Sequence, residues 1–182
     1  HGKGSSPISI TIDGAELPAV YGAFESTVET PENMTAVTIS VKGDAAVESL
    51  YGLFRTYCTG GVLIDTEESV TIKSLYGLRS STMDGDITEN INYNCDGNTF
   101  VTLATDGYYT GKAYTINGDA VFNMNGAGIS SVYIVQNGAV LSKTLTAKVT
   151  DSKVDNLCGV SQSAKVDGDV SLTFDGISAV KD

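Results

Sequence analysis

The stretch that decides the predicted fold lies at residues 131–149 and reads SVYIVQNGAVLSKTLTAKV. Two strand-like segments, 131–135 and 139–149, flank the turn Asn137-Gly138. Apolar and polar residues largely alternate in the second segment, which indicates a strand with one buried face and one solvent-exposed face. Because Asn-Gly tolerates the positive φ of a tight turn, the stretch predicts an antiparallel hairpin.

The same turn chemistry recurs along the whole chain. Asp-Gly pairs begin at residues 13, 84, 96, 106, 167 and 175, and Asn-Gly pairs begin at 117, 125 and 137. Alternating, strand-like patterns also occur at 8–12, 36–41, 100–103 and 170–174. Short strands between frequent turns are typical of sandwiches and barrels. We therefore predict a mostly β protein, an antiparallel β-sandwich or jelly roll with one or two short helices on its connections.

One segment is predicted to be helical. Apolar residues recur at helical spacing from Val47 to Cys58, after Asp44 as a suitable N-cap, and Gly60-Gly61 would end the helix. The pattern predicts one amphipathic helix over 45–58. The pentapeptide SLYGL occurs at 49–53 and again at 74–78. Because the flanking sequences differ, these two copies favour coincidence or a local duplication over a repeat fold.

The N-terminal strand has two possible uses. Ile8, Ile10 and Ile12 place three β-branched apolar side chains on one face, after a Gly- and Ser-rich leader. The strand could be the edge of its own sheet, or it could pair with the open sheet of a neighbouring copy. We predict that residues 1–12 form a donor arm and that 13–182 form a single β-sandwich domain. Because the chain begins with His1, we expect that a leader has been removed or that His1 is an expression remnant.

Composition excludes several classes of function. The 11 Lys and Arg against 22 Asp and Glu give a formal charge of −11, and only two residues are arginines, so no nucleic-acid partner is expected. No apolar run approaches the ~20 residues that span a bilayer. His1 is the single histidine, which removes Ser-His-Asp and Cys-His arrangements and leaves a copper brace without its second histidine. We predict that the protein is not an enzyme.

The three cysteines leave two alternatives open. Cys58, Cys95 and Cys158 lie far apart and form no CxxC pair, so zinc and thioredoxin motifs are missing. One disulfide with one free thiol, which an exported protein could form, is as compatible with this pattern as three buried reduced cysteines.

Acidic turns are candidate calcium sites. Glycine between two oxygen-bearing residues lets their side chains converge, and Ca²⁺ takes six to eight oxygen ligands. The candidate ligands are Asp84, Asp86, Glu89, Asp96, Asn98, Asp119, Asp167 and Asp169. None of the turns matches an EF-hand, so a site would combine two turns or two subunits. Plain hairpin turns also explain the pattern, but the net charge favours bound cations, and we expect Ca²⁺.

Together these features are similar to archaeal extracellular tube proteins, the cannulae, and more distantly to jelly-roll subunits of biofilm-matrix filaments. The matched positions are Ile8, Ile10 and Ile12 for a donated strand and the acidic turns for calcium. The resemblance implies a secreted subunit, extracellular or at the cell surface, that forms homopolymers by N-terminal strand donation with Ca²⁺ between copies. The alternative is a calcium-dependent carbohydrate-binding or adhesive module.

In that alternative, surface tyrosines would contact glycans, since an aromatic ring combines an apolar face with a polar edge. The tyrosines that motivate it are Tyr108, Tyr109 and Tyr114.

Overall fold

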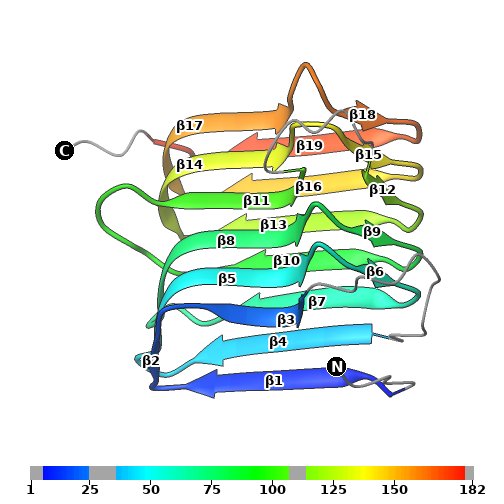
Figure 1. The fold of residues 1–182 in the computed structure, drawn as a ribbon. Coiled ribbons are helices and arrows are strands. Elements are labelled where there is room, and N and C mark those ends of the chain that lie inside the picture. Colours follow the sequence, from blue (N-terminus) through cyan, green and yellow to red (C-terminus); the bar gives the residue numbers. More distant parts are fainter. Residues whose placement is uncertain (1–5, 25–35, 107–113, 179–182) are drawn as a thin grey trace.

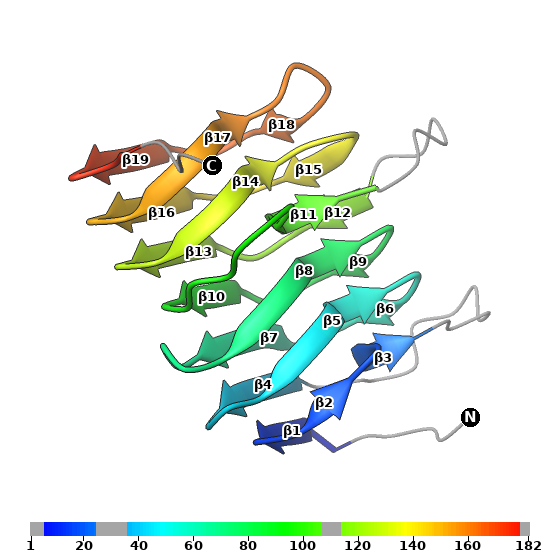
Figure 2. The same ribbon diagram turned by 90° about the vertical axis from the view of Figure 1, so that its left-hand side faces the viewer.

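The structure, a computed structural model, describes residues 6–24, 36–106 and 114–178. The chain winds into a β-solenoid whose coils stack from the N-terminal end at the bottom to the C-terminal end at the top (Figure 1). Successive coils add strands to three sheets, which are seen from the side in Figure 2. Every strand pairing in the described residues is parallel, and these residues contain no helix.

The three sheets are named A, B and C in the order in which the chain meets them. Sheet A contains seven strands: β1 (Ile8–Asp13), β4 (Ala36–Lys42), β7 (Gly61–Thr66), β10 (Ile87–Ile91), β13 (Ala120–Asn125), β16 (Leu145–Thr150) and β19 (Val170–Asp175). Sheet B contains β2 (Glu16–Leu17), β3 (Val20–Phe24), β5 (Ala46–Phe54), β8 (Thr71–Arg79), β11 (Phe100–Thr105), β14 (Gly128–Val135) and β17 (Lys153–Val160). Sheet C contains β6 (Tyr57–Cys58), β9 (Thr82–Met83), β12 (Tyr114–Ile116), β15 (Ala139–Leu141) and β18 (Lys165–Val166).

A regular offset between coils organises the interior. Ala120 pairs with Leu145, and hydrogen bonds between neighbouring coils join residues 25 positions apart. The coil that begins with β10 is longer, since Asn123 donates to Asn90, 33 positions earlier. A fixed offset brings the same strand position to the interior in every coil, and the buried side chains therefore form columns along the stack. One such column in sheet A consists of Val37, Val62, Ile87, Ala120 and Leu145.

The predicted hairpin at 131–149 is wrong. Its first segment is β14, which pairs with β11 and β17 in sheet B, while 139–141 is β15, which pairs with β12 and β18 in sheet C. Asn137 and Gly138 do have positive φ, of 47° and 76°. A corner between two sheets needs such a conformation as much as a hairpin does, so the turn residues alone do not determine which strands pair.

The predicted helix at 45–58 is also wrong, because this segment forms β5 and β6. All four residues from Leu50 to Leu53 are buried, and this run interrupts the two-residue alternation and imitates a helical pattern. The two SLYGL copies lie side by side in β5 and β8, with Leu50 opposite Leu75 and Tyr51 opposite Tyr76. They are neighbouring turns of a repeat fold, contrary to the interpretation as coincidence or local duplication.

The antiparallel β-sandwich and the jelly roll are therefore both corrected to a parallel β-solenoid. Alternation along a strand identifies its buried face but not the strand beside it, and parallel coils satisfy that alternation as well as hairpins do. The same correction applies to the sandwich predicted for 13–182.

Candidate functional site

The C-terminal end of the solenoid leaves apolar side chains uncovered. β19 is the last strand of sheet A and pairs with β16 on one side, with no described strand on the other. Val170, Leu172 and Phe174 occupy the positions that are buried in β16, yet they are 47, 39 and 44% exposed. A row of large apolar side chains beside an open strand edge is a surface suited to pairing with another chain. We name these three residues the C-terminal face.

β1 forms the opposite end of sheet A. It pairs with β4, and no described strand lies on its other edge. Ile8 and Ile10 are half-buried and Ile12 is buried, with all three packed against the core. The residues predicted to be donated thus lie in the sheet of their own chain, with one strand edge open. We name Ile8, Ile10 and Ile12 the N-terminal face. Residues 1–5 of the predicted arm lie outside the described residues.

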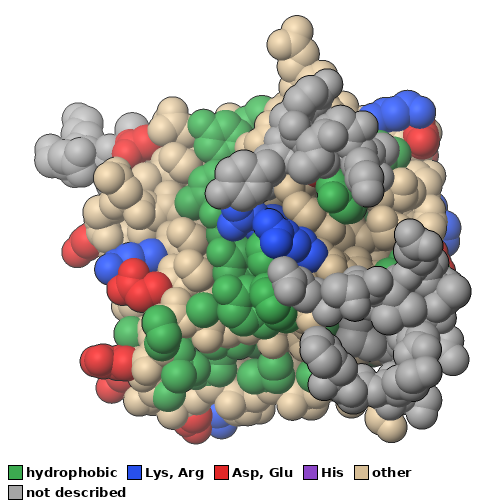
Figure 3. Space-filling model, viewed as in Figure 1, with side chains coloured by type: hydrophobic (Ala, Val, Ile, Leu, Met, Phe, Trp, Pro, Cys, Tyr) green, Lys and Arg blue, Asp and Glu red, His purple; other side chains and the backbone are tan. Residues whose placement is uncertain are grey.

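An aromatic stripe follows the outer face of sheet B, and Figure 3 shows it as part of a hydrophobic band along the stack. The rings of Tyr21, Tyr51 and Tyr76 stack with centroids 4.9 Å apart and interplanar angles of 3° and 6°. Phe100 and Tyr133 extend the stripe, with centroid distances of 5.3 and 5.9 Å. Rings stacked in this way cover one another's faces, so the middle of the stripe stabilises coil stacking and presents ring edges outward.

Both arginines of the chain lie against this stripe. The Arg79 guanidinium carbon is 5.0 Å from the ring centroid of Tyr76 and 5.5 Å from that of Phe54. The Arg55 guanidinium carbon lies 5.0 Å from the ring centroid of Phe54, the residue that precedes it in the chain. Arg79 also donates a hydrogen bond from Nη1 to the hydroxyl oxygen of Tyr51 at 3.3 Å. Cation–π contacts of this kind hold the positive charges on the aromatic surface.

The acidic turns lie along one edge of the solenoid, where coils pass from sheet C to sheet A. They connect β9 to β10, β12 to β13 and β18 to β19. The structure therefore brings five predicted ligands to one edge: Asp84, Asp86, Asp119, Asp167 and Asp169. The turns fit closely, because a Cβ atom at Gly118 would collide with the backbone of Gly85 in the turn below.

Several of these carboxylates accept hydrogen bonds from the neighbouring turn. Asp86 Oδ1 accepts the backbone N–H of Asp119 at 2.8 Å, and Asp119 Oδ1 accepts that of Thr144 at 3.1 Å. Asp84 accepts hydrogen bonds from the Tyr57 hydroxyl and, at 2.7 Å, from Asn117 Nδ2. The hydrogen bond from Tyr57 first, and that from Asn117 second, lower the pKa of Asp84. The turn carboxylates thus join coil to coil.

The other predicted ligands lie elsewhere. Asp96 and Asn98 follow β10, whereas Asp86 precedes it, and Glu89 faces the interior. No group of three or more His, Cys, Asp or Glu residues suited to holding a metal ion occurs within the described part of the chain. Calcium binding by the turns stays a prediction.

Glu89 is a fully buried carboxyl group. It lies in β10 between Ile64 and Phe122 of the neighbouring strands, with 0% exposure, and neither oxygen has a hydrogen-bond partner among the described residues. Burial raises the pKa of Glu89 well above its ordinary value. The fully buried Tyr93 hydroxyl likewise has no partner there, and its pKa is raised, first by burial. Sequence analysis missed this position of Glu89. The alternation of Ile87, Glu89 and Ile91 is the sequence signal that could have shown that Glu89 points inward.

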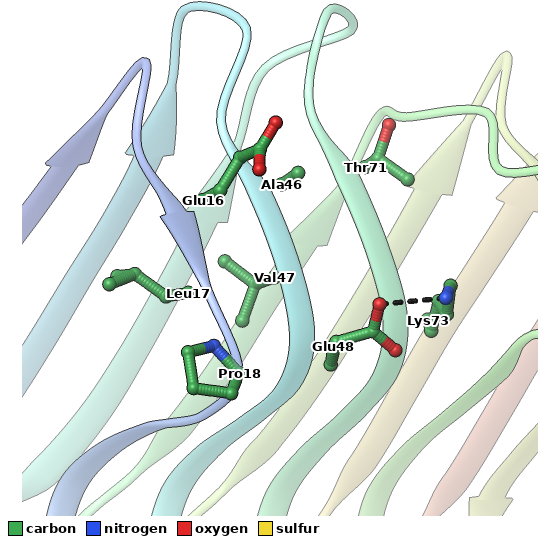
Figure 4. Close-up of a pocket in the computed structure, with 8 residues that line it drawn as sticks. All are labelled: Glu16, Leu17, Pro18, Ala46, Val47, Glu48, Thr71 and Lys73. Carbon is green, nitrogen blue, oxygen red and sulfur yellow. Dashed lines mark hydrogen bonds and ion pairs between the residues drawn. The ribbon is translucent and has the colours of Figure 1, made fainter.

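A shallow groove lies between β2 and the neighbouring strands β5 and β8 (Figure 4). Leu17, Pro18 and Val47 form its apolar part. At its side, Lys73 Nζ lies 2.7 Å from Glu48 Oε1, and both side chains are more than half exposed. The charges of Lys73 and Glu48 neutralise each other in solvent. We therefore describe the groove as a depression of the surface and assign no ligand to it.

The remaining sequence predictions concern cysteines, membranes and tyrosines. Cys58, Cys95 and Cys158 are free thiols, but only Cys58 is buried, so the alternative of three buried reduced cysteines matches the structure in the thiols and not in the burial of Cys95 and Cys158. Within the described ranges, no helix has the length and apolar character needed to cross a membrane. Of the tyrosines suggested for glycan binding, Tyr114 lies in β12, while Tyr108 and Tyr109 lie outside the described residues.

Comparisons of this chain with family models, with curated proteins and with solved structures yield no match. The end faces, the stripe and the turns are therefore the features of the molecule that bear on its function.

Proposed function

We propose that this protein is a non-enzymatic structural subunit, extracellular or at the cell surface, whose copies stack end to end into filaments. The exposed C-terminal face carries the proposal: Val170, Leu172 and Phe174 repeat the buried positions of the coil below without a coil above them in the described residues. Covering this face would remove apolar surface from water, which stabilises the contact by about 25 cal/mol for each Å² buried. It would also pair the free backbone groups of β19.

The position of the two faces supports an open-ended polymer. β1 and β19 are the two edges of the same seven-stranded sheet. A contact between one copy's C-terminal face and another copy's N-terminal face is heterologous, since two different surfaces meet. Such a contact generates a filament when the arrangement does not close into a ring. The N-terminal strand contributes its free edge in this arrangement and keeps its pairing with β4.

The test places a charge on the C-terminal face. Leu172→Lys puts an ammonium group into the apolar interior row of the proposed contact, whereas Ser171→Lys adds the same charge to the neighbouring position of β19, whose side chain faces outward into solvent. Negative-stain electron microscopy and sedimentation velocity are expected to show filaments for the wild type and Ser171→Lys, and monomers for Leu172→Lys. Filaments of equal length and yield from Leu172→Lys would contradict the proposal.

A second candidate, a carbohydrate-binding or adhesive module, has one observation in its favour. Tyr21 and Phe24, at the N-terminal end of the aromatic stripe, are 39 and 51% exposed. Their rings lie 4.9 Å apart at 59°, so one partly open aromatic surface remains for a sugar. A glycan array with the wild type and a Tyr21→Ala/Phe24→Ala variant tests this candidate. Binding that the double variant loses would favour it, and the lack of binding by the wild type would count against it.

A further inference from the structure

We infer that stacked copies continue sheet A in a single register, with Ile8 of one copy opposite Val170 of the copy before it. This inference rests on the proposed end-to-end assembly and specifies its interface. The occupant of the C-terminal face is therefore a second copy of this chain, contributing its N-terminal face.

The pairing within sheet A sets the register. Each strand of the sheet places one equivalent residue beside the next, in the order Ile8, Val37, Val62, Ile87, Ala120, Leu145 and Val170. Ile8 and Val170 thus occupy the same position of the coil at opposite ends of the stack. A copy that continues the sheet places Ile8 opposite Val170 and, two and four residues further on, isoleucines opposite Leu172 and Phe174.

The side chains on both faces of the strands agree with this register. The interior row pairs isoleucine with valine, leucine and phenylalanine. The outer row pairs Ser9 with Ser171 and Thr11 with Thr173, which are small hydroxyl side chains suited to neighbouring strands. A slip of one residue would place isoleucines beside serine and threonine and would turn the apolar row toward solvent. Pro7, which has no backbone N–H, stands directly before the paired segment, where a strand tolerates proline.

The register also brings together one unfavourable pair. Asp13 and Asp175 end their strands at equivalent positions, so their carboxylates become neighbours across the contact. Lys42 Nζ lies 3.2 Å from Asp13 Oδ2 and offsets part of this repulsion. Assembly is therefore expected to increase with ionic strength, since salt screens both this pair and the overall charge of −11.

The axial repeat follows from the strand count. Each copy contributes seven strands to sheet A, and neighbouring strands lie about 4.8 Å apart, so successive copies are offset by about 34 Å along the filament. Cryo-electron microscopy is expected to give a layer line at about 4.8 Å together with this subunit repeat.

Disulfide trapping tests the register directly. In the inferred contact, Ser9 and Ser171 lie on adjacent strands, and a Cα separation of about 5 Å permits a disulfide. In the control, Thr11→Cys with Ser171→Cys, the two residues are displaced along the strands and lie about 8 Å apart. Both double variants and the unaltered protein, which carries three native cysteines, are oxidised with oxidised glutathione and separated on non-reducing gels.

The expected result is a ladder of cross-linked oligomers from Ser9→Cys/Ser171→Cys, at least ~10-fold stronger than from Thr11→Cys/Ser171→Cys or the unaltered protein. Filaments seen by electron microscopy without this preference would overturn the register and leave end-to-end assembly standing. If no filaments form under any tested salt concentration, the proposed function and the register are both overturned.

Discussion

Replacing Glu89 with methionine is expected to stabilise the protein, because methionine fills a similar volume without a carboxyl group. Both Glu89 oxygens are buried and lack hydrogen-bond partners in the described structure. Leaving a buried polar group unpaired costs about 1–3 kcal/mol. For a chain of this length, 1 kcal/mol shifts Tm by about 2–4 °C. The expected gain in Tm at neutral pH is therefore about 2–12 °C.

The gain is expected to depend on pH. Burial raises the pKa of Glu89 in the folded state, so the folded protein retains a proton that the unfolded chain releases above its ordinary pKa of 4.5. The wild type therefore loses stability as pH rises from 4.5 toward the raised pKa of the folded state, and the loss then stays constant. Because methionine does not titrate, the advantage of Glu89→Met is smallest near pH 4 and grows above it.

Circular dichroism melts at pH 4 and pH 8 measure this difference. Glu68→Met makes the same replacement at an exposed glutamate and controls for effects of the substitution that do not depend on burial. Glu89→Gln retains a buried polar group but cannot ionise, so it should remove the pH dependence and recover only part of the stability. A lower Tm for Glu89→Met at both pH values, or an equal gain at pH 4 and pH 8, would refute the reasoning.

Three further outcomes are expected. Gly77→Ala should destabilise the solenoid by about 1–3 kcal/mol, because its methyl group would lie 2.6 Å from the carbonyl oxygen of Leu103 and 2.8 Å from Ile87 Cδ1; an unchanged Tm would contradict this packing. Asp175→Asn should lower the critical concentration for assembly by up to about fivefold, since like charges opposite each other cost about 0.2–1 kcal/mol. Light scattering measures the critical concentration, and an unchanged value would argue against the register. If Ca²⁺ binds the acidic turns, EGTA should lower Tm and CaCl₂ should restore it, whereas identical melts would contradict the calcium prediction.

Sequence reasoning located the strands better than their partners. The alternating segments at 8–12, 36–41, 100–103 and 170–174 do lie in strands of the structure. Their pairing could not follow from alternation, which is the same in parallel and antiparallel sheets. The strongest available signal for pairing was the SLYGL repeat, whose two copies begin 25 positions apart at Ser49 and Ser74.

The candidate site was harder to predict than the fold. The pattern of 170–174 resembles that of the buried strands, and its exposure results from its place at the end of the stack. The residue types of a strand do not show whether that strand lies in the middle or at the end of the stack. The acidic residues were placed in turns, but their use as acceptors for the adjacent coil required knowing that turns stack on turns.

The 25-residue coil has a mechanical consequence. The backbone hydrogen bonds between coils run along the stack, and an end coil is paired on one side only, so a force that pulls the two chain ends apart can detach an end coil while the pairing of the coils beneath it stays intact. Each regular coil that detaches releases 25 residues, or about 80–90 Å of extended chain. A filament of such subunits would yield to tension in steps of this length, with each step absorbing work while the remaining coils stay folded.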